Sequence, residues 1–485
     1  MVGVGMYTAL RRQLEESPPV EEQPSLEDVP PLEQIGPRDD LAEESDLPDE
    51  QLDQVLDDDV LQRHVDSFSN IVNAIEIGAD SSGDTPINDV IDAYAIEDTL
   101  LAFPPGTYGI DPVEIYGRRQ FGLVGVGDDP TRIVPTSGNC RGANPYLRFD
   151  GIESLTLDSL TFDFRDEGTG GPVHFLLEGE SVIRDFTFAG SCLEQISMMR
   201  VEVLDEDGSA EFLNLQTQNV DADDSLTGVY VGANHAGDVI FRDCLLLDFS
   251  DNALYASAPG EADGADGDVH VIGGEYRNNN IAGVRLGSTA ATARDVRVVV
   301  DGQTPGNGNL NARGFRLRNR ADQVIEDCEI AFAGNAANSF GAIVFHPDNG
   351  GGVVRNTGIR MERNNVPAIK AFPVDGPTDT APQFEWLVVG GNAENGATVD
   401  IEGRDETTFR KCRIVQRGSN RSGIELVDCA NCRIVDSYIE VDTAPIVLED
   451  SNVSIENTSV VTSAAGAYID EMTAENEEVD PVVLD

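Results

Sequence analysis

The sequence predicts an all-β fold in which the chain winds into a single parallel β-helix. Two observations lead to this prediction. The first is a six-residue pattern that recurs through most of the chain and reads apolar, any, Asp or Asn, small or apolar, any, apolar. The second is its spacing, because most gaps between successive copies are 21 to 32 residues. A repeat of this length is the sequence signature of a solenoid.

The repeat itself explains why the chain would coil. Apolar residues alternate within each copy, as they do in a strand with one buried face. The Asp or Asn at the third position tolerates a left-handed backbone, so it marks a sharp bend between two short strands. Two longer gaps, 185 to 243 and 356 to 411, each leave room for an unmarked copy. Clear copies lie at 157–162, 183–188, 241–246, 325–330, 354–359, 409–414, 434–439 and 455–460.

Four regions follow one another along the chain. Residues 1–59 are acidic and proline-rich, and we expect a disordered arm that tethers the protein to a virion, a surface layer or a partner, or that has no role. Residues 60–108 should form an N-terminal cap and the first coil, with helical spacing of apolar residues from Val60 to Ala74. The β-helix should fill residues 109–470, and 471–485 form an acidic tail.

Two strings near the start carry a family resemblance. The segment Gly78-Ala79-Asp80-Ser81-Ser82-Gly83 is followed by Phe103-Pro104-Pro105-Gly106-Thr107-Tyr108. In these strings the chain resembles the right-handed parallel β-helix proteins of the pectate-lyase-like superfamily, over roughly residues 72 to 465. The resemblance implies a right-handed coil. It implies no single activity, because enzymes, virus tail spikes and binding proteins share the motif.

The charge of the chain points to its surroundings. Asp and Glu number 88 against 32 Lys and Arg, for a formal charge of −56, and Lys370 and Lys411 are the only lysines. At molar salt the screening length is about 3 Å, so the self-repulsion of such a surface costs little. We therefore predict an origin in a halophilic archaeon or its virus. The same charge argues against nucleic acid as a partner.

Sequence signals for location are few. No stretch reaches the roughly 18 apolar residues that a membrane span needs, and the N-terminus lacks the basic leader and apolar core of a standard signal peptide. We expect an extracellular or virion-associated protein, and leave a cytoplasmic location open.

The cysteines indicate packing rather than metal binding. Cys244, Cys328 and Cys412 share one position of the repeat, where a small inward-facing core residue is expected. Cys429 and Cys432 have metal-like spacing, but no second pair or neighbouring His completes a site. No metal and no cofactor is predicted from these residues.

One column of outward residues is the candidate ligand-binding site. It takes the residue after the inward apolar one in each strand that follows a variable turn, and consecutive coils lie ~4.8 Å apart. Aromatic faces suit sugar rings, and Arg forks suit carboxylates or sulfates. The alternative is that the cations pair with local acids and the tyrosines only favour strands. The column is Tyr230, Tyr255, Arg285, Arg316, Val344, Lys370, Glu425 and Val447, with Arg318 and His346 facing the same side.

The family resemblance also raises the question of catalysis. Lyases of the superfamily abstract a proton with Arg or Lys and hold Ca²⁺ with acidic residues, and Arg285, Arg316 and Lys370 suit that base by type. Calcium is therefore the one metal that the resemblance brings in, although no acidic set stands out among so many. Hydrolases use paired carboxylates. The loop histidines His235 and His346 are acid–base candidates by type, although a loop His is more often merely exposed.

Three functions follow from these observations. The first is a glycan-binding structural or adhesive surface protein, such as a tail-spike-like virion component of a halophile virus. The second is a polysaccharide lyase or glycoside hydrolase that acts on an acidic polysaccharide, and the third is a purely structural solenoid. The expected partner is a polysaccharide or cell-surface glycan. A homo-trimer, or a virion partner joined through the N-terminal arm, is the assembly considered, and the sequence does not decide whether the protein is an enzyme.

Overall fold

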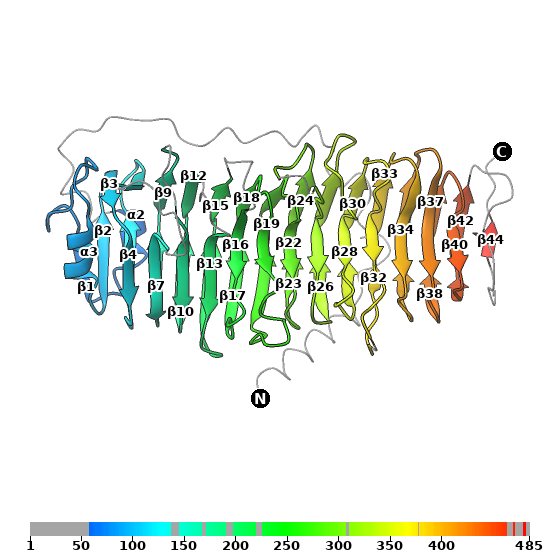
Figure 1. Cartoon of the computed structure of the whole chain (residues 1–485), viewed down its shortest axis with the longest axis horizontal. Helices are drawn as coiled ribbons and strands as arrows, with labels where there is room; N and C mark the ends of the chain where they lie inside the picture. The colour runs from blue at the N-terminus through cyan, green and yellow to red at the C-terminus, as the bar shows by residue number, and fades with distance from the viewer. Residues whose placement is uncertain are drawn as a thin grey trace.

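In a computed structural model, the chain forms a right-handed parallel β-helix whose coils stack into a rod (Figure 1). The structure describes residues 58–136, 145–166, 171–190, 197–219, 226–306, 310–376 and 378–462, together with two short strands at 469–470 and 479–481. All-β architecture and parallel pairing throughout confirm the predicted fold. Residues 1–57 of the predicted arm lie outside the described residues, as does most of the acidic tail, whereas Asp58 and Asp59 begin a short helix.

Three long parallel sheets form the walls of the rod. Sheet A, in spatial order, consists of β1 (Asn70–Asn73), β2 (Thr99–Phe103), β5 (Phe121–Gly125), β8 (Leu155–Asp158), β11 (Glu180–Arg184), β14 (Ser209–Leu213), β17 (Asp238–Arg242), β20 (Asp268–Ile272), β23 (Thr292–Arg294), β26 (Gln323–Glu326), β29 (Gly352–Arg355), β32 (Gln383–Glu385), β35 (Thr408–Arg410), β38 (Cys432–Val435) and β41 (Val453–Glu456). Sheet B consists of β3 (Gly106–Ile110), β6 (Thr131–Pro135), β9 (Leu160–Phe164), β12 (Thr187–Gly190), β15 (Gln216–Gln218), β18 (Leu245–Leu247), β21 (Glu275–Arg277), β24 (Arg297–Val300), β27 (Glu329–Phe332), β30 (Gly358–Met361), β33 (Val388–Gly391), β36 (Arg413–Gln416), β39 (Tyr438–Val441), β42 (Thr458–Thr462) and β44 (Val479–Pro481). Sheet C consists of β4 (Val113–Tyr116), β7 (Leu147–Ile152), β10 (Val173–Leu177), β13 (Ser197–Val203), β16 (Thr227–Val231), β19 (Asn252–Ala256), β22 (Ala282–Leu286), β25 (Phe315–Leu317), β28 (Ile343–Phe345), β31 (Ile369–Ala371), β34 (Gly396–Glu402), β37 (Arg421–Val427), β40 (Ile446–Glu449) and β43 (Ile469–Asp470).

The six-residue repeat is the corner at which the chain passes from sheet A to sheet B. Its third residue adopts a positive φ in every coil from β8 to β42, and the next residue turns inward at the start of the sheet B strand. The two long gaps do hold unmarked corners, at Asn214 (φ 54°) and Trp386 (φ 55°). The corner residues are Ser159, Asp185, Asn214, Asp243, Gly273, Asp295, Asp327, Asn356, Trp386, Lys411, Asp436 and Asn457.

Neighbouring corners are joined by their side chains as well as by the sheets. The register pairs Glu326 of β26 with Arg355 of β29, so positions 327 and 356 stand one above the other. The Asn356 amide then donates to the Asp327 carboxylate, and Asn457 Nδ2 donates to Asp436 Oδ1 at 2.7 Å. Each such bond satisfies polar atoms that the bend would otherwise leave unpaired.

The interior of the rod is filled by one continuous core. Aromatic rings stack from coil to coil, with centroids 5.2 Å apart for Phe212 and Phe241 and 4.8 Å apart for Phe384 and Phe409. The predicted inward position of Cys244, Cys328 and Cys412 is confirmed, because all three are buried free thiols. Burial raises the pKa of each to about 12, so they are packing residues rather than nucleophiles.

The predicted helix from Val60 to Ala74 is wrong. Helix α2 covers only Asp59–Gln62, and residues Asn70–Asn73 form β1, which pairs with β2. The β-branched Ile71 and Val72 beside two asparagines favour a strand over a helix, and β1 covers the edge of β2. Leu61 of α2 packs in a small cluster with Phe68 and Leu100, apart from the main core.

The helix that does reach the main core at this end is α3 (Asn88–Tyr94). It contributes Val90 and Ile91 to the core cluster and lies at the N-terminal end of the rod (Figure 1). Solenoids need such a cover because the first coil would otherwise expose its apolar interior.

Candidate ligand-binding face of sheet C

The strand register of sheet C places the predicted column on successive rungs. Tyr230 pairs with Tyr255, Tyr255 with Arg285, Arg285 with Arg316, Arg316 with Val344, and Val344 with Lys370. The next rung is Asp400, and Glu425 and Val447 follow it. Sequence reasoning therefore missed one coil between Lys370 and Glu425. The role of these residues in ligand binding stays a prediction.

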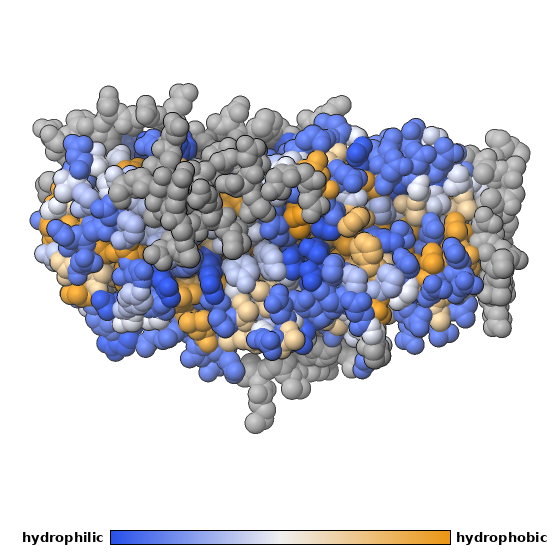
Figure 2. All heavy atoms as spheres, in the orientation of Figure 1, coloured by the Kyte–Doolittle hydropathy of each residue, from blue (hydrophilic) through white to orange (hydrophobic). Residues whose placement is uncertain are grey.

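The column also continues toward the N-terminus through residues that sequence reasoning missed. Arg148, His174 and Arg200 occupy the rungs before Tyr230. The signal was present, because each sits between two inward apolar residues, as in Leu147-Arg148-Phe149. The residue directly before the first of these apolar residues is Tyr146, Pro172 or Met198, whereas the alignment relied on a Gly or Ala at that position. Most of the surface shown in Figure 2 is hydrophilic, with hydrophobic residues in separate patches.

Two tyrosines and an arginine make the first half of the site. The rings of Tyr230 and Tyr255 meet edge to face at 5.3 Å between centroids. The Arg285 guanidinium lies over the Tyr255 ring, 3.7 Å from its centroid, and Nε donates to Ser257 Oγ at 2.7 Å. One face of Tyr255 is thus already covered by a cation, which fixes Arg285 in place. Tyr230 remains half-buried.

Arg285 belongs to a group of four arginines, which we call the arginine cluster: Arg285, Arg313, Arg316 and Arg318. Burial first, and then the neighbouring arginines, lower the pKa of Arg316 below the ordinary value. The pKa of Arg313 is lowered for the same reasons, burial first. A guanidinium stays charged near neutral pH in proteins, so these shifts measure how unfavourable the crowding of positive charge is.

The predicted alternative, that the cations pair with local acids, holds for some of them. Arg318 Nε lies 2.7 Å from Asp348 Oδ2, and Lys370 Nζ lies 2.8 Å from Asp400 Oδ2. By contrast, Arg285, Arg313 and Arg316 form no ion pair with any carboxylate in the described part of the chain. Some cations on this face are therefore paired with a carboxylate, and others are not.

Aromatic side chains border the arginine cluster on its C-terminal side. Phe340 is 50% exposed, and its ring centroid lies 5.5 Å from that of Phe372. Arg313 Cζ lies 5.1 Å from the Phe340 ring centroid and Lys370 Nζ 5.3 Å from that of Phe372. Since an exposed Phe contacts solvent at a cost, this pair is a candidate surface for an apolar part of a ligand.

The two histidines differ in their surroundings. His346 Nδ1 lies 3.1 Å from Asp348 Oδ1, and burial, despite that carboxylate, lowers the pKa of His346. Burial alone would raise the pKa of Asp348, but hydrogen bonds from His346 and Arg318 hold it well below its usual range. His346 is therefore a neutral imidazole at pH 7 that shares a carboxylate with Arg318.

His235 has a structural position instead of the exposed loop position that was expected. It is fully buried, its Nδ1 accepts from the Val203 amide at 3.1 Å, and its Nε2 donates to the Asp268 carbonyl at 3.0 Å. Burial lowers its pKa. With both ring nitrogens occupied, His235 has no free nitrogen for proton transfer.

The remaining predicted sites show no ligand geometry. Within the described ranges, no three His, Cys, Asp or Glu side chains gather in a way that would hold a metal ion. Cys429, in the turn after β37, and Cys432, the first residue of β38, are buried free thiols. In the same part of the chain no helix is long and apolar enough to cross a membrane.

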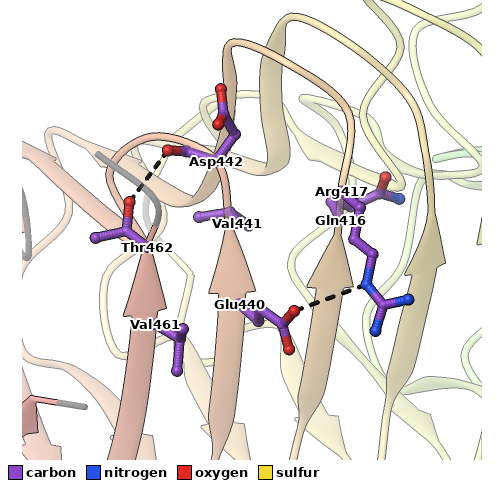
Figure 3. Close-up of a pocket in the computed structure, with 7 residues that line it drawn as sticks. All are labelled: Gln416, Arg417, Glu440, Val441, Asp442, Val461 and Thr462. Atoms are coloured by element: carbon purple, nitrogen blue, oxygen red, sulfur yellow. Dashed lines mark hydrogen bonds and ion pairs between the residues drawn. The ribbon is translucent and has the colours of Figure 1, made fainter. Parts of the chain in front are cut away.

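A cavity of about 300 Å³ lies elsewhere, at the ends of β36, β39 and β42 in sheet B. Its lining side chains come from three consecutive coils, and Arg417 and Glu440 point toward one another, with Arg417 Nε 3.7 Å from Glu440 Oε1 (Figure 3). Thr462 Oγ1 donates to the Asp442 carbonyl at 3.1 Å. None of the predicted column residues lines this cavity, whose charged side chains largely satisfy one another.

Comparisons with known proteins place the chain only at the level of architecture. No family model and no curated protein matches it. Among solved structures, the surface adhesin PfbA of Streptococcus pneumoniae is 13% identical with a TM-score of 0.44, covering 82% of this chain and 93% of that one. The A-module of the mannuronan C-5 epimerase AlgE6 of Azotobacter vinelandii is 13% identical with a TM-score of 0.40, covering 85% and 99%. The catalytic unit of a GH87 alpha-1,3-glucanase from Streptomyces thermodiastaticus is 13% identical with a TM-score of 0.37, covering 85% and 69%. These similarities concern the coiled fold, and no functional argument rests on them.

Proposed function

We propose that this protein is a glycan-binding structural or adhesive surface protein whose ligand lies along the outer face of sheet C. The observation that supports the proposal is the column itself. It sets Tyr230, Tyr255, Arg285 and Arg316 on four consecutive rungs, and Arg285 and Arg316 have no described carboxylate partner. A sugar chain that runs along the rod would meet one of these side chains about every 4.8 Å.

The face suits a glycan because it is rigid before the ligand arrives. Each side chain stands on a strand that is hydrogen-bonded on both sides, and Arg285 is held by Tyr255 and Ser257. A surface that is already ordered loses little conformational entropy on binding. Tyrosine faces contribute apolar contact to sugar rings, and guanidinium groups contribute donors.

Charge along the column gives the ligand a preferred position. From Tyr230 to Arg316 the outward rungs are aromatic or basic, whereas Asp400 and Glu425 follow Lys370. The earlier rungs Arg148 and Arg200 are already paired with Asp150 and Glu202. Burial raises the pKa of Glu425, and the neighbouring Asp400 adds to the rise. An acidic glycan would therefore lie on the rungs that end at Arg316 and avoid the acidic rungs Asp400 and Glu425.

Glycan retention in molar salt tests the proposal. Arg285, Arg316 and Lys370 replaced together by Ala should abolish binding to host-surface and uronate-containing glycans presented on an array. The matched control replaces Arg297, Arg360 and Arg413 of sheet B by Ala, which removes the same charge from a different face. Unchanged binding by the first variant would reject the column, and no retained glycan at all would favour a purely structural solenoid.

A polysaccharide lyase or glycoside hydrolase that acts on acidic polysaccharide is the second candidate. One observation favours it: Arg285 and Arg316, which suit the base of a lyase by type, lie on adjacent rungs and have no carboxylate partner among the described residues. Incubation with uronate-containing glycans in molar salt separates the two functions. New unsaturated or reducing ends would establish turnover, and their absence together with retained glycan would establish a binding protein.

For the setting, we propose a cell or virion surface at high salt, with a tail-spike-like component of a halophile virus as the specific form. The charge of −56 with only two lysines supports the high-salt part. The identity of the neighbouring genes, capsid and tail genes or genes of sugar metabolism, is the observation that would distinguish a virion component from a cellular protein.

A further inference from the structure

The arginine cluster is largely buried, holds several positive charges close together, and has few carboxylate partners among the described residues. Arg285 and Arg313 are only 7% and 6% exposed, and Arg316 occupies the rung of sheet C next to Arg285. Mutual repulsion makes such crowding unfavourable unless an opposite charge is present. The chain carries 88 acidic residues, so a neutralising carboxylate could have been supplied by the protein.

Two described carboxylates lie near the cluster, and both are already engaged by other groups. Asp251 accepts from Thr227 Oγ1 at 3.0 Å and from Asn252 Nδ2 at 2.9 Å. Asp348 accepts from Arg318 Nε and Nη2, from the Asn319 amide at 3.2 Å and from His346. Among the described residues, three of the four arginines of the cluster thus form no ion pair with a carboxylate. Buried charges in proteins are ordinarily paired, so the missing partner has to come from outside the described chain.

Unused donors show where that partner would bind. The Nε atoms of Arg313 and Arg316 are buried and have no hydrogen-bond partner. Most buried donors in folded proteins are satisfied, and exceptions call for an absent ligand or water. A guanidinium presents its donors as a planar fork that fits the two oxygens of a carboxylate or sulfate.

The neighbours hold the arginines in place without using all of these donors. Arg285 rests on Tyr255, and Arg313 rests against Phe340 while its Nη1 donates to the Ile281 carbonyl at 3.0 Å. Both contacts orient a cation and add no negative charge. Aromatic rings thus border the cluster on two sides, where the ring of a saccharide would contact them.

We propose that the arginine cluster is an oxyanion subsite, centred on Arg316, that takes the carboxylate or sulfate group of an acidic saccharide. A uronate and a sulfate ester share the oxyanion that the forks recognise, so both belong to this class. The inference rests on the proposed function only for the saccharide part, because the oxyanion site stands on its own geometry.

Small probes test the subsite on the full-length protein. In molar KCl at fixed ionic strength, glucuronate and sulfate should each raise the thermal midpoint of the wild-type protein, whereas glucose, the neutral counterpart of glucuronate, should not. Arg316→Gln should weaken glucuronate binding at least tenfold by calorimetry. The matched control Arg297→Gln removes the same charge from sheet B and should bind like wild type.

The outcomes separate this inference from the proposed function. An equal response of wild-type protein and Arg316→Gln to both anions, or no response of either, overturns the subsite. If glycans are retained through Tyr230 and Tyr255 with no preference for acidic over neutral chains, the proposed function survives and the subsite fails. If the anions bind through Arg316 and no glycan is retained, the subsite survives and the glycan-binding face fails. A response to sulfate alone identifies a sulfated ligand, and a response to glucuronate alone a uronate.

Discussion

At the scale of single residues, ion pairs decide how carboxylates titrate, because 88 acidic residues share 32 basic ones. Asp163 in β9 illustrates this. Its side chain is 5% exposed and accepts from Arg165 Nε at 2.8 Å and from Arg132. Burial alone would raise the pKa of Asp163, but these hydrogen bonds outweigh burial and lower it to about 2.

The sign of the resulting pH dependence follows from the lowered pKa. The charged carboxylate is favoured in the folded state, so its contribution to stability is complete above the unfolded pKa near 4 and is lost as pH falls through about 2. Asp163→Asn should therefore lower the free energy of unfolding by about 2 kcal/mol at pH 7, and by less at pH 3. Urea unfolding at both pH values measures this. The exposed Asp92→Asn is the control, and a loss that does not depend on pH would contradict the linkage.

The corner residues are the second place where one side chain matters. Asn356 has φ 47°, a conformation that costs an ordinary L-residue roughly 1–2 kcal/mol and glycine almost nothing. Asn356→Val should therefore destabilise the protein by about 1–2 kcal/mol more than Asn356→Gly. Both variants lose the amide bond to Asp327, so their difference isolates the backbone. Equal denaturation midpoints would show that the bend does not need the left-handed conformation.

Between elements, a buried arginine joins loops that belong to different coils. Arg404, 2% exposed, follows β34, and its guanidinium donates to the carbonyls of Phe372 and His346 at 2.7 and 2.8 Å and to that of Asn349. Burial lowers its pKa, as expected for a cation whose partners are neutral carbonyls. Through this residue, the loop that carries His346 and Asp348 is fixed beside the arginine cluster.

Removal of this clamp should be costly. Arg404→Met leaves buried carbonyls without donors, and we expect the free energy of unfolding to fall by about 3 kcal/mol or more. Hydrogen exchange at the amides of His346, Asp348 and Asn349 should quicken before global unfolding. The control is Arg433→Met, because Arg433 is exposed and its ion pair with Glu456 is worth little. If Arg404→Met lowers the free energy of unfolding no more than the control does, Arg404 does not hold these loops in place.

For the molecule as a whole, charge and salt decide stability together. A formal charge of −56 repels itself over the whole rod, and the screening length shortens from ~10 Å at 0.1 M to ~3 Å at 1 M salt. The thermal midpoint should therefore rise steeply from 0.1 M to 2 M KCl at pH 7. Equal midpoints at the two concentrations would argue against adaptation to high salt. The same titration at pH 4 serves as the control, since partial protonation of the carboxylates should flatten the dependence.

The repeating features of the fold could be predicted from the sequence because every coil has the same local requirements. A bend needs Asn, Asp or another residue tolerant of positive φ, and an inward position needs an apolar or small side chain such as Cys244. These requirements recur every 21 to 32 residues, which is why the solenoid, the aligned corners and the rungs from Tyr230 to Lys370 were predictable. The helix predicted from Val60 does not continue to Ala74 because residues Asn70–Asn73 pair with strand β2 as strand β1. This pairing outweighs the helix propensity of the segment.

The sequence does not show which charged side chains remain unpaired, because the pairing depends on residues from different coils. Arg318 and Arg316 look alike in sequence, yet the loop after β28 brings Asp348 to the first and leaves the second without a carboxylate among the described residues. Arg404, more than fifty residues from His346 in the chain, holds that loop in position. Local order therefore dictates the coil, through backbone conformation and alternation of side chains. Charges pair across coils, and a pattern in the sequence does not show these contacts. This pairing decides what the face of sheet C can bind.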